Sequence, residues 1–82
     1  MISRSVKVRI PQELERNAAM LVQTASDFES KIHVTYLNRT VNAKSIMGVM
    51  TLPLSDGDDV TLSIDGSDEE KAMIAMCSFL NG

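Results

Sequence analysis

The chain is poor in the residue types that stabilise very small proteins. Among its 82 residues are one cysteine, two prolines, two phenylalanines, one tyrosine and no tryptophan. A single cysteine excludes an intramolecular disulfide, and Cys77 stands among apolar neighbours, so we expect a buried, unreactive thiol. With so few aromatic rings, the core must be aliphatic, filled by valine, isoleucine, leucine and the six methionines.

Long apolar runs and clustered basic charge are absent as well. No stretch is long enough to cross a bilayer, and no basic leader precedes an apolar segment. Eleven acidic and eight basic side chains give a net charge of −3, which argues against direct binding to nucleic acid. The sequence therefore predicts one cytoplasmic domain over residues 1–82, with no metal site, no cofactor and no membrane contact.

Alternating apolar and polar positions predict four strands. In the first strand Arg4 is the one polar residue on the apolar side, and Pro11 ends the run. Asn38 and Arg39 make a short turn between the second and third strands, which predicts a hairpin. A polar turn over residues 55–58 precedes the fourth strand. The predicted strands cover residues 2–10, 32–37, 40–42 and 60–64.

Three segments carry helical signals. Apolar residues recur at spacings of three and four up to Phe28, so a helix begins near Arg16. A brief helix opens at Ser45. Ser67 to Glu70 form a capping box, in which the serine hydroxyl accepts from an amide and Glu70 reaches back. The helix that follows has a buried stripe of Met73, Met76, Cys77 and Leu80. The element order is thus β-α-β-β-α-β-α, one sheet with helices on a single face.

The segment VNAKSIMGVM, residues 41–50, resembles the regulatory-serine motif of the HPr family, the phosphocarriers of the sugar phosphotransferase system. LVQTASDF at residues 21–28 resembles the first helix of that family, and the acidic start of the last helix, residues 66–70, fits as well. The resemblance covers nearly the whole chain. It implies an α+β fold, an open-faced β-sandwich whose four-stranded antiparallel sheet carries three helices on one face.

The chain departs from the family at the histidine that carries the phosphoryl group. Family members have a Gly-Leu-His-Ala-Arg-Pro-like segment before the first helix, whereas residues 13–17 here read ELERN. The histidine position falls on Leu14, or on Glu15 if a one-residue deletion lies there. Neither is a nitrogen nucleophile, and the charge of Glu15 would repel a phosphoryl group. The only histidine, His33, is in mid-strand, so the comparison implies a non-catalytic member without the carrier chemistry.

Ser45 has two compatible interpretations. As an N-cap, its hydroxyl stabilises the start of the short helix by roughly 0.5–2 kcal/mol. The resemblance implies in addition a regulatory site, phosphorylated by HPr kinase/phosphorylase, whose modified form binds a catabolite control repressor or a metabolic enzyme. A helix start accepts the added charge of about −1.5 to −2 without unfolding.

The resemblance also implies a partner-binding surface around Ser45. We expect one or two of the three apolar residues that follow Ser45 to belong to the core, and methionine suits a surface that meets several partners. Arg16 is either a bidentate ligand for a phosphate or carboxylate, or a solvated cation at the helix end. The predicted surface comprises Arg16, Met20, Gln23, Ile46, Met47 and Met50.

Two other functions stay open from the sequence. One is a phosphocarrier of the sugar phosphotransferase system that uses a residue other than the usual histidine. The other is a docking protein without covalent modification. Proteins of this fold can exchange their first strand between protomers, so the chain is a monomer or a strand-swapped dimer.

Overall fold

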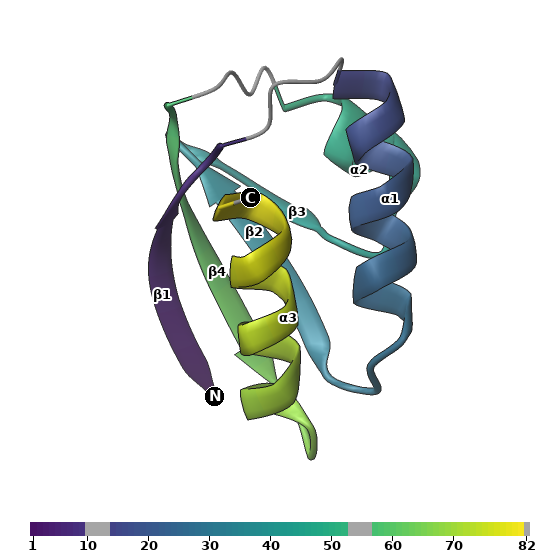
Figure 1. Cartoon of the computed structure of the whole chain (residues 1–82), viewed down its shortest axis with the longest axis vertical. Coiled ribbons are helices and arrows are strands. Elements are labelled where there is room, and N and C mark those ends of the chain that lie inside the picture. Colours follow the sequence, from purple (N-terminus) through teal and green to yellow (C-terminus); the bar gives the residue numbers. More distant parts are fainter. Residues whose placement is uncertain (10–13, 53–56, 82) are drawn as a thin grey trace.

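The computed structural model describes residues 1–9, 14–52 and 57–81, and residues 14–17 only by their place in a helix. Its elements follow the predicted order β-α-β-β-α-β-α (Figure 1). The strands are β1 (Ile2–Lys7), β2 (Lys31–Tyr36), β3 (Arg39–Asn42) and β4 (Asp59–Asp65). The helices are α1 (Leu14–Ser26), α2 (Ile46–Met50) and α3 (Glu69–Asn81).

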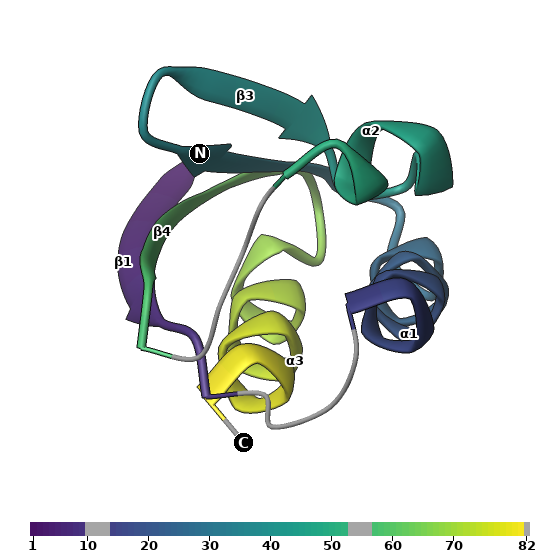
Figure 2. The same cartoon turned by 90° about the horizontal axis from the view of Figure 1, so that it is seen from above.

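The strands form one antiparallel sheet in the order β1-β4-β2-β3. The pairing register aligns Ile2 with Ile64 and Ile64 with Ile32, so that alternate residues form apolar rows across the strands. These rows face the helices, which lie on one side of the sheet (Figure 2). The other side is not covered by helices (Figure 2). It carries hydroxyl side chains such as those of Ser3 and Ser63, which face each other and are hydrogen-bonded at 3.2 Å. The predicted fold class is confirmed.

The core lies between the apolar rows and the helices, and it is aliphatic as expected. Ala18, Leu21 and Ala25 supply the buried stripe of α1. The largest fully buried apolar side chains of the rest of the core are Ile32, Val34, Leu52, Val60, Leu62, Ile64, Met76 and Leu80. Removing one such side chain from water contributes about 1.5–3 kcal/mol, so the packing of the sheet against the helices is a large source of stability.

Several element boundaries differ from those predicted. β1 ends at Lys7, whereas the predicted strand residue Ile10 lies outside the described residues, as do Pro11 and the first part of the turn at 55–58. α1 begins at Leu14, two residues before the predicted start. Cys77 is half-buried rather than buried, at the margin of the core.

The predicted capping box is wrong in its register. It is Glu69 whose carboxylate accepts from the Gly66 amide, at 3.2 Å, and α3 begins at that glutamate. The Ser67 hydroxyl donates instead to the Glu29 carboxylate at 3.4 Å. This difference in register has a cause outside the segment. The Asp68 carboxylate accepts from the backbone amides of Glu29 and Ser30, and this contact fixes the position of the residues before α3.

The hairpin turn consists of Leu37 and Asn38, one residue earlier than predicted, and Arg39 is the first residue of β3. Leu37 has φ 57°, the left-handed region that costs a residue with a Cβ roughly 1–2 kcal/mol. Its side chain is 79% exposed, so little burial offsets this cost.

Leu37→Gly should therefore raise the free energy of unfolding, by about 1 kcal/mol once the greater freedom of glycine in the unfolded chain is deducted. Urea denaturation followed by circular dichroism measures the change. Leu37→Ala is the matched control, since it removes the same apolar side chain but retains the Cβ. A gain of stability in the alanine variant as large as in the glycine variant would assign the cost to the exposed side chain instead of the backbone.

Candidate phosphorylation and docking site

Ser45 is positioned by the turn that leaves β3. The Asn42 side chain accepts from the Lys44 amide at 2.9 Å, and the Asn42 carbonyl accepts from the Ser45 amide at 3.0 Å. The buried Ala43 ties the turn to the sheet, because its amide donates to the carbonyl of Ile32 at 2.9 Å. This Asx-type turn directs the chain from the sheet edge into α2.

Ser45 is the N-cap of α2, which confirms that interpretation. It has extended backbone angles, φ −107° and ψ 110°, and its Oγ accepts from the Gly48 amide at 3.3 Å. Thr51 closes the other end of the helix, its hydroxyl donating to the Gly48 carbonyl at 2.6 Å. The Ser45 side chain is exposed. One hydroxyl thus caps a helix and faces solvent at the same time.

Gly48 faces Val41 of β3 with room for a small side chain. A Cβ at this position would stand 3.4 Å from the Cβ of Val41 and 3.5 Å from the Oγ of Ser45. Val49, the next residue, is buried, and so is Leu52 just after the helix. One face of α2 is therefore held on the core, while the other face is presented outward.

Ile46, Met47 and Met50 form that outward face, and their exposed fractions are 39%, 79% and 47%. The expectation that one or two of them belong to the core is wrong. A helix of five residues has about one turn and a half, and Val49 takes its one buried position. The three side chains make an apolar surface directly after the capping serine, which we call the α2 surface.

α1 packs beside α2 (Figures 1 and 2). The Lys44 ammonium donates to the Phe28 carbonyl at 2.6 Å, so it joins the segment just after α1 to the turn before Ser45. The sequence analysis did not identify this lysine as a support of the site. Met20 and Gln23 of α1 are both exposed and lie one turn apart on that helix.

The remaining predicted site residues are at the start of α1. Leu14 and Glu15 are its first two residues and Arg16 its third, and their side chains lie outside the described part of the chain. The two interpretations of Arg16 stay predictions for that reason. His33 is opposite Asn42 of β3 and Ser63 of β4. It therefore belongs to a polar row of the sheet and not to the start of α1.

The described residues hold neither a metal-binding cluster nor a membrane-spanning helix. Within residues 1–9, 14–52 and 57–81, no three His, Cys, Asp or Glu side chains are grouped so that they could hold a metal ion. The helices found in these same ranges are all too short or too polar to span a membrane.

Comparisons with known proteins agree with this geometry. A family model described as the PTS HPr component phosphorylation site matches residues 2–82. The chain is 41% identical over 81 residues to the HPr-like protein Crh of Halalkalibacterium halodurans, which covers 98% of this chain and 96% of that protein.

Solved structures give the same result. The phosphocarrier protein HPr of Bacillus anthracis has a TM-score of 0.91 at 38% identity, covering 96% of this chain and 95% of that one. Crh of Bacillus subtilis, described as a dimer with a swapped domain, has a TM-score of 0.77 at 40% identity, covering 98% and 93%. Because a family model and relatives of this identity span almost the whole chain, the protein belongs to the HPr family.

Proposed function

We propose that this chain is a non-catalytic regulatory protein of the HPr family, phosphorylated on Ser45 by HPr kinase/phosphorylase and active in carbon catabolite repression. The observation that carries the proposal is the exposed Ser45 hydroxyl directly before the exposed α2 surface. The likeness to the catabolite repression HPr of Bacillus subtilis, 36% identical over 96% of this chain, supports the same role. We place the protein in the cytoplasm, where ATP is available to such a kinase.

The geometry of Ser45 suits modification in the folded state. Its Oγ accepts one hydrogen bond, from Gly48, and donates none to any described residue. The oxygen can attack the γ-phosphorus of ATP, with ADP as the leaving group and the hydroxyl proton passing to a base of the kinase. The phosphoryl oxygens remain acceptors, so the cap can be retained after the transfer.

Phosphorylation would change what the α2 surface can bind. It adds about −1.5 to −2 charges next to apolar side chains. A partner that places an arginine beside an apolar patch would then gain charge-assisted hydrogen bonds, which are the stronger kind. We assign this partner surface to Arg16, Met20, Gln23, Ile46, Met47 and Met50, and the partner to a catabolite control repressor or a metabolic enzyme.

The residues at and near the expected histidine position argue against phosphoryl transfer by this chain. Leu14 has no lone pair, and the charge of Glu15 opposes a second anionic group. His33 lies in a polar row of the sheet, paired with Ser63 and Asn42. A phosphoryl group therefore has no imidazole to receive it at the start of α1.

Incubation with HPr kinase/phosphorylase and ATP should add one phosphate, detected by intact-mass measurement, and peptide mapping should place it on Ser45. Ser45→Ala removes the cap, at a cost of roughly 0.5–2 kcal/mol, so its folding is checked by circular dichroism. Ser26→Ala, in the exposed last turn of α1, is the matched control and keeps full modification.

Other outcomes would favour the other two functions. An acid-labile phosphate taken from phosphoenolpyruvate through the general enzyme of the sugar phosphotransferase system would establish a carrier. Equal binding of a catabolite control repressor to the unmodified chain, the phosphorylated chain and Ser45→Ala would establish a docking protein without covalent regulation. Either result contradicts the proposal.

A further inference from the structure

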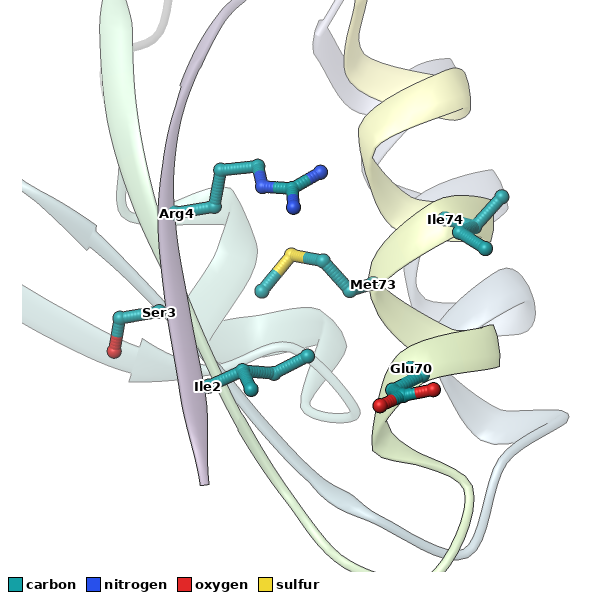
Figure 3. Close-up of a pocket in the computed structure, with 6 residues that line it drawn as sticks. All are labelled: Ile2, Ser3, Arg4, Glu70, Met73 and Ile74. Atoms are coloured by element: carbon teal, nitrogen blue, oxygen red, sulfur yellow. The ribbon is translucent and has the colours of Figure 1, made fainter.

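A groove runs along β1, at the opposite edge of the sheet from β3 and α2. It consists of two adjoining hollows that share Arg4. One, of about 440 Å³, lies between the start of β1 and Glu70, Met73 and Ile74 of α3 (Figure 3). The other, of about 530 Å³, lies between the second half of β1 and the part of α3 around Cys77. The site is therefore elongated and follows the strand.

The outer edge of the β1 backbone, on the side away from β4, has no strand paired with it. β1 is the outermost strand and pairs only with β4. The Val8 amide donates to the Asp58 carbonyl at 2.7 Å in the register of the β1–β4 pair. Because bonding to the neighbour alternates along an antiparallel strand, the amides and carbonyls of Ser3, Ser5 and Lys7 point away from the sheet. Such a row can accept a further strand.

Arg4 is a cation of the groove that has no partner among the described residues. It projects from β1 toward α3, as Ile2 does, whereas Ser3 points to the other side of the strand (Figure 3). Arg4 is exposed, and no hydrogen bond or ion pair joins it to another residue of the described chain. Lys7, in contrast, binds the Asp59 carboxylate at 3.5 Å. An incoming group opposite Arg4 would therefore meet an exposed guanidinium.

The wall of α3 beside Arg4 is partly apolar, and Glu70 is its one acidic side chain. Met73 reaches from α3 toward β1 beside the arginine (Figure 3). Ile74 lies at the rim and is 68% exposed, an uncommon state for a large aliphatic residue. Because side chains alternate along a strand, a peptide paired with β1 would direct every second side chain into this groove.

We propose that the β1 edge binds an extended acidic segment of a partner protein, which adds a strand to β1 and sets a carboxylate against Arg4. Apolar side chains two residues before and after that carboxylate would lie opposite Ile2, in the first hollow, and Val6, in the second. The main-chain bonds supply affinity, and the arginine with the nearby Met73 and Ile74 supplies specificity.

The charge of β1 favours an acidic segment over a second copy of β1 at this edge. Residues 1–9 contain Arg4, Lys7 and Arg9 and no acidic side chain, although the whole chain has a net charge of −3. Of the residues that line the two hollows, Arg4 and Lys7 are basic and only Glu70 is acidic. A second copy of β1 at this edge would bring like charges together, which destabilises cross-strand pairs. An acidic strand has the opposite sign. Arginine and lysine on an edge strand also hinder aggregation without any partner, and the experiment below separates these roles.

The probe is a fluorescein-labelled peptide, TVTETVT, whose glutamate and valines share one face of a strand. It should bind saturably in fluorescence anisotropy, and the backbone ¹⁵N–¹H signals of Ser3, Ser5 and Lys7 should shift. The lysine analogue TVTKTVT should not bind. Arg4→Gln should weaken binding roughly tenfold, the loss of one charge-assisted hydrogen bond. Ser45→Ala should leave it unchanged, so this result is independent of the proposed phosphorylation.

Ser5→Pro tests the main-chain part. Proline at an edge position whose amide faces solvent preserves the sheet but removes the outward donor. It should abolish binding, whereas Ser5→Ala should retain it, with circular dichroism confirming that both variants fold. Equal binding of the two peptides, or full binding by Ser5→Pro, would overturn the proposal. So would a lack of binding together with aggregation of Arg4→Gln, which would leave the arginine only its protective role.

Discussion

Gly66→Ala should lower the free energy of unfolding by about 1–3 kcal/mol, the usual cost of forcing extra atoms into a packed site. An added Cβ would stand 2.5 Å from the Cα of Ser30 and 2.7 Å from its Cβ, far inside van der Waals contact. Ser30 is 1% exposed and cannot move aside, because its amide and hydroxyl are bound by Asp68. Urea denaturation followed by circular dichroism measures the loss.

Gly48→Ala is the control, because it should leave the free energy of unfolding unchanged or raise it. A Cβ there makes ordinary contacts, at 3.4 Å from Val41, and alanine favours a helix over glycine by roughly 0.5–1 kcal/mol. This variant should be as stable as the parent chain or more stable. If both variants lost the same free energy of unfolding, the short distance between Gly66 and Ser30 would not be the reason why alanine destabilises position 66.

The fold could be predicted from the sequence because its main signals are local. Val60, Leu62 and Ile64 alternate with polar residues, and all three are buried in β4. Ala18, Leu21 and Ala25 recur at helical spacing and form the buried stripe of α1. Each period depends only on backbone geometry within one element, so it is visible without knowledge of the neighbours.

What could not be predicted depends on contacts between distant segments. Asp68 meets residues 38 and 39 positions away, and this contact shifts the cap of α3 to Glu69. The turn at Leu37 is set by the pairing of β2 with β3, which leaves only two residues to connect them. No local preference would place a leucine in the left-handed region.

The candidate site also has features that the local sequence predicts and features that depend on contacts between distant segments. The role of Ser45 as a cap is readable from one residue and the short helix after it. The exposure of Ile46, Met47 and Met50 is not, because it depends on which face of α2 meets β3. The bond from Lys44 to Phe28 exists only once α1 has packed beside α2.

Asp68→Asn should destabilise the protein at neutral pH more than any other exchange of an acidic side chain for its amide among the described residues. One carboxylate oxygen accepts from the Glu29 amide at 2.9 Å. The other accepts from the Ser30 amide at 3.0 Å and from the Ser30 hydroxyl. The NH₂ group of asparagine cannot accept, so at least one of these donors loses its partner. Asp65→Asn, at an exposed aspartate, is the matched control.

The effect should also depend on pH. The hydrogen bond from the Ser30 hydroxyl, and after it the one from the Glu29 amide, lower the pKa of Asp68 below its ordinary value. A carboxylate whose pKa is lower in the folded chain stabilises fully above its unfolded pKa of about 3.9, and this contribution is lost as the pH falls through the folded pKa. The gap between the parent chain and Asp68→Asn should therefore close as denaturation is repeated from about pH 7 to about pH 2. A difference in the free energy of unfolding that stays constant over this range, or an equal difference for Asp65→Asn, would contradict the prediction. It would mean that the Asp68 carboxylate does not stabilise the contact between the segment before α3 and the segment before β2.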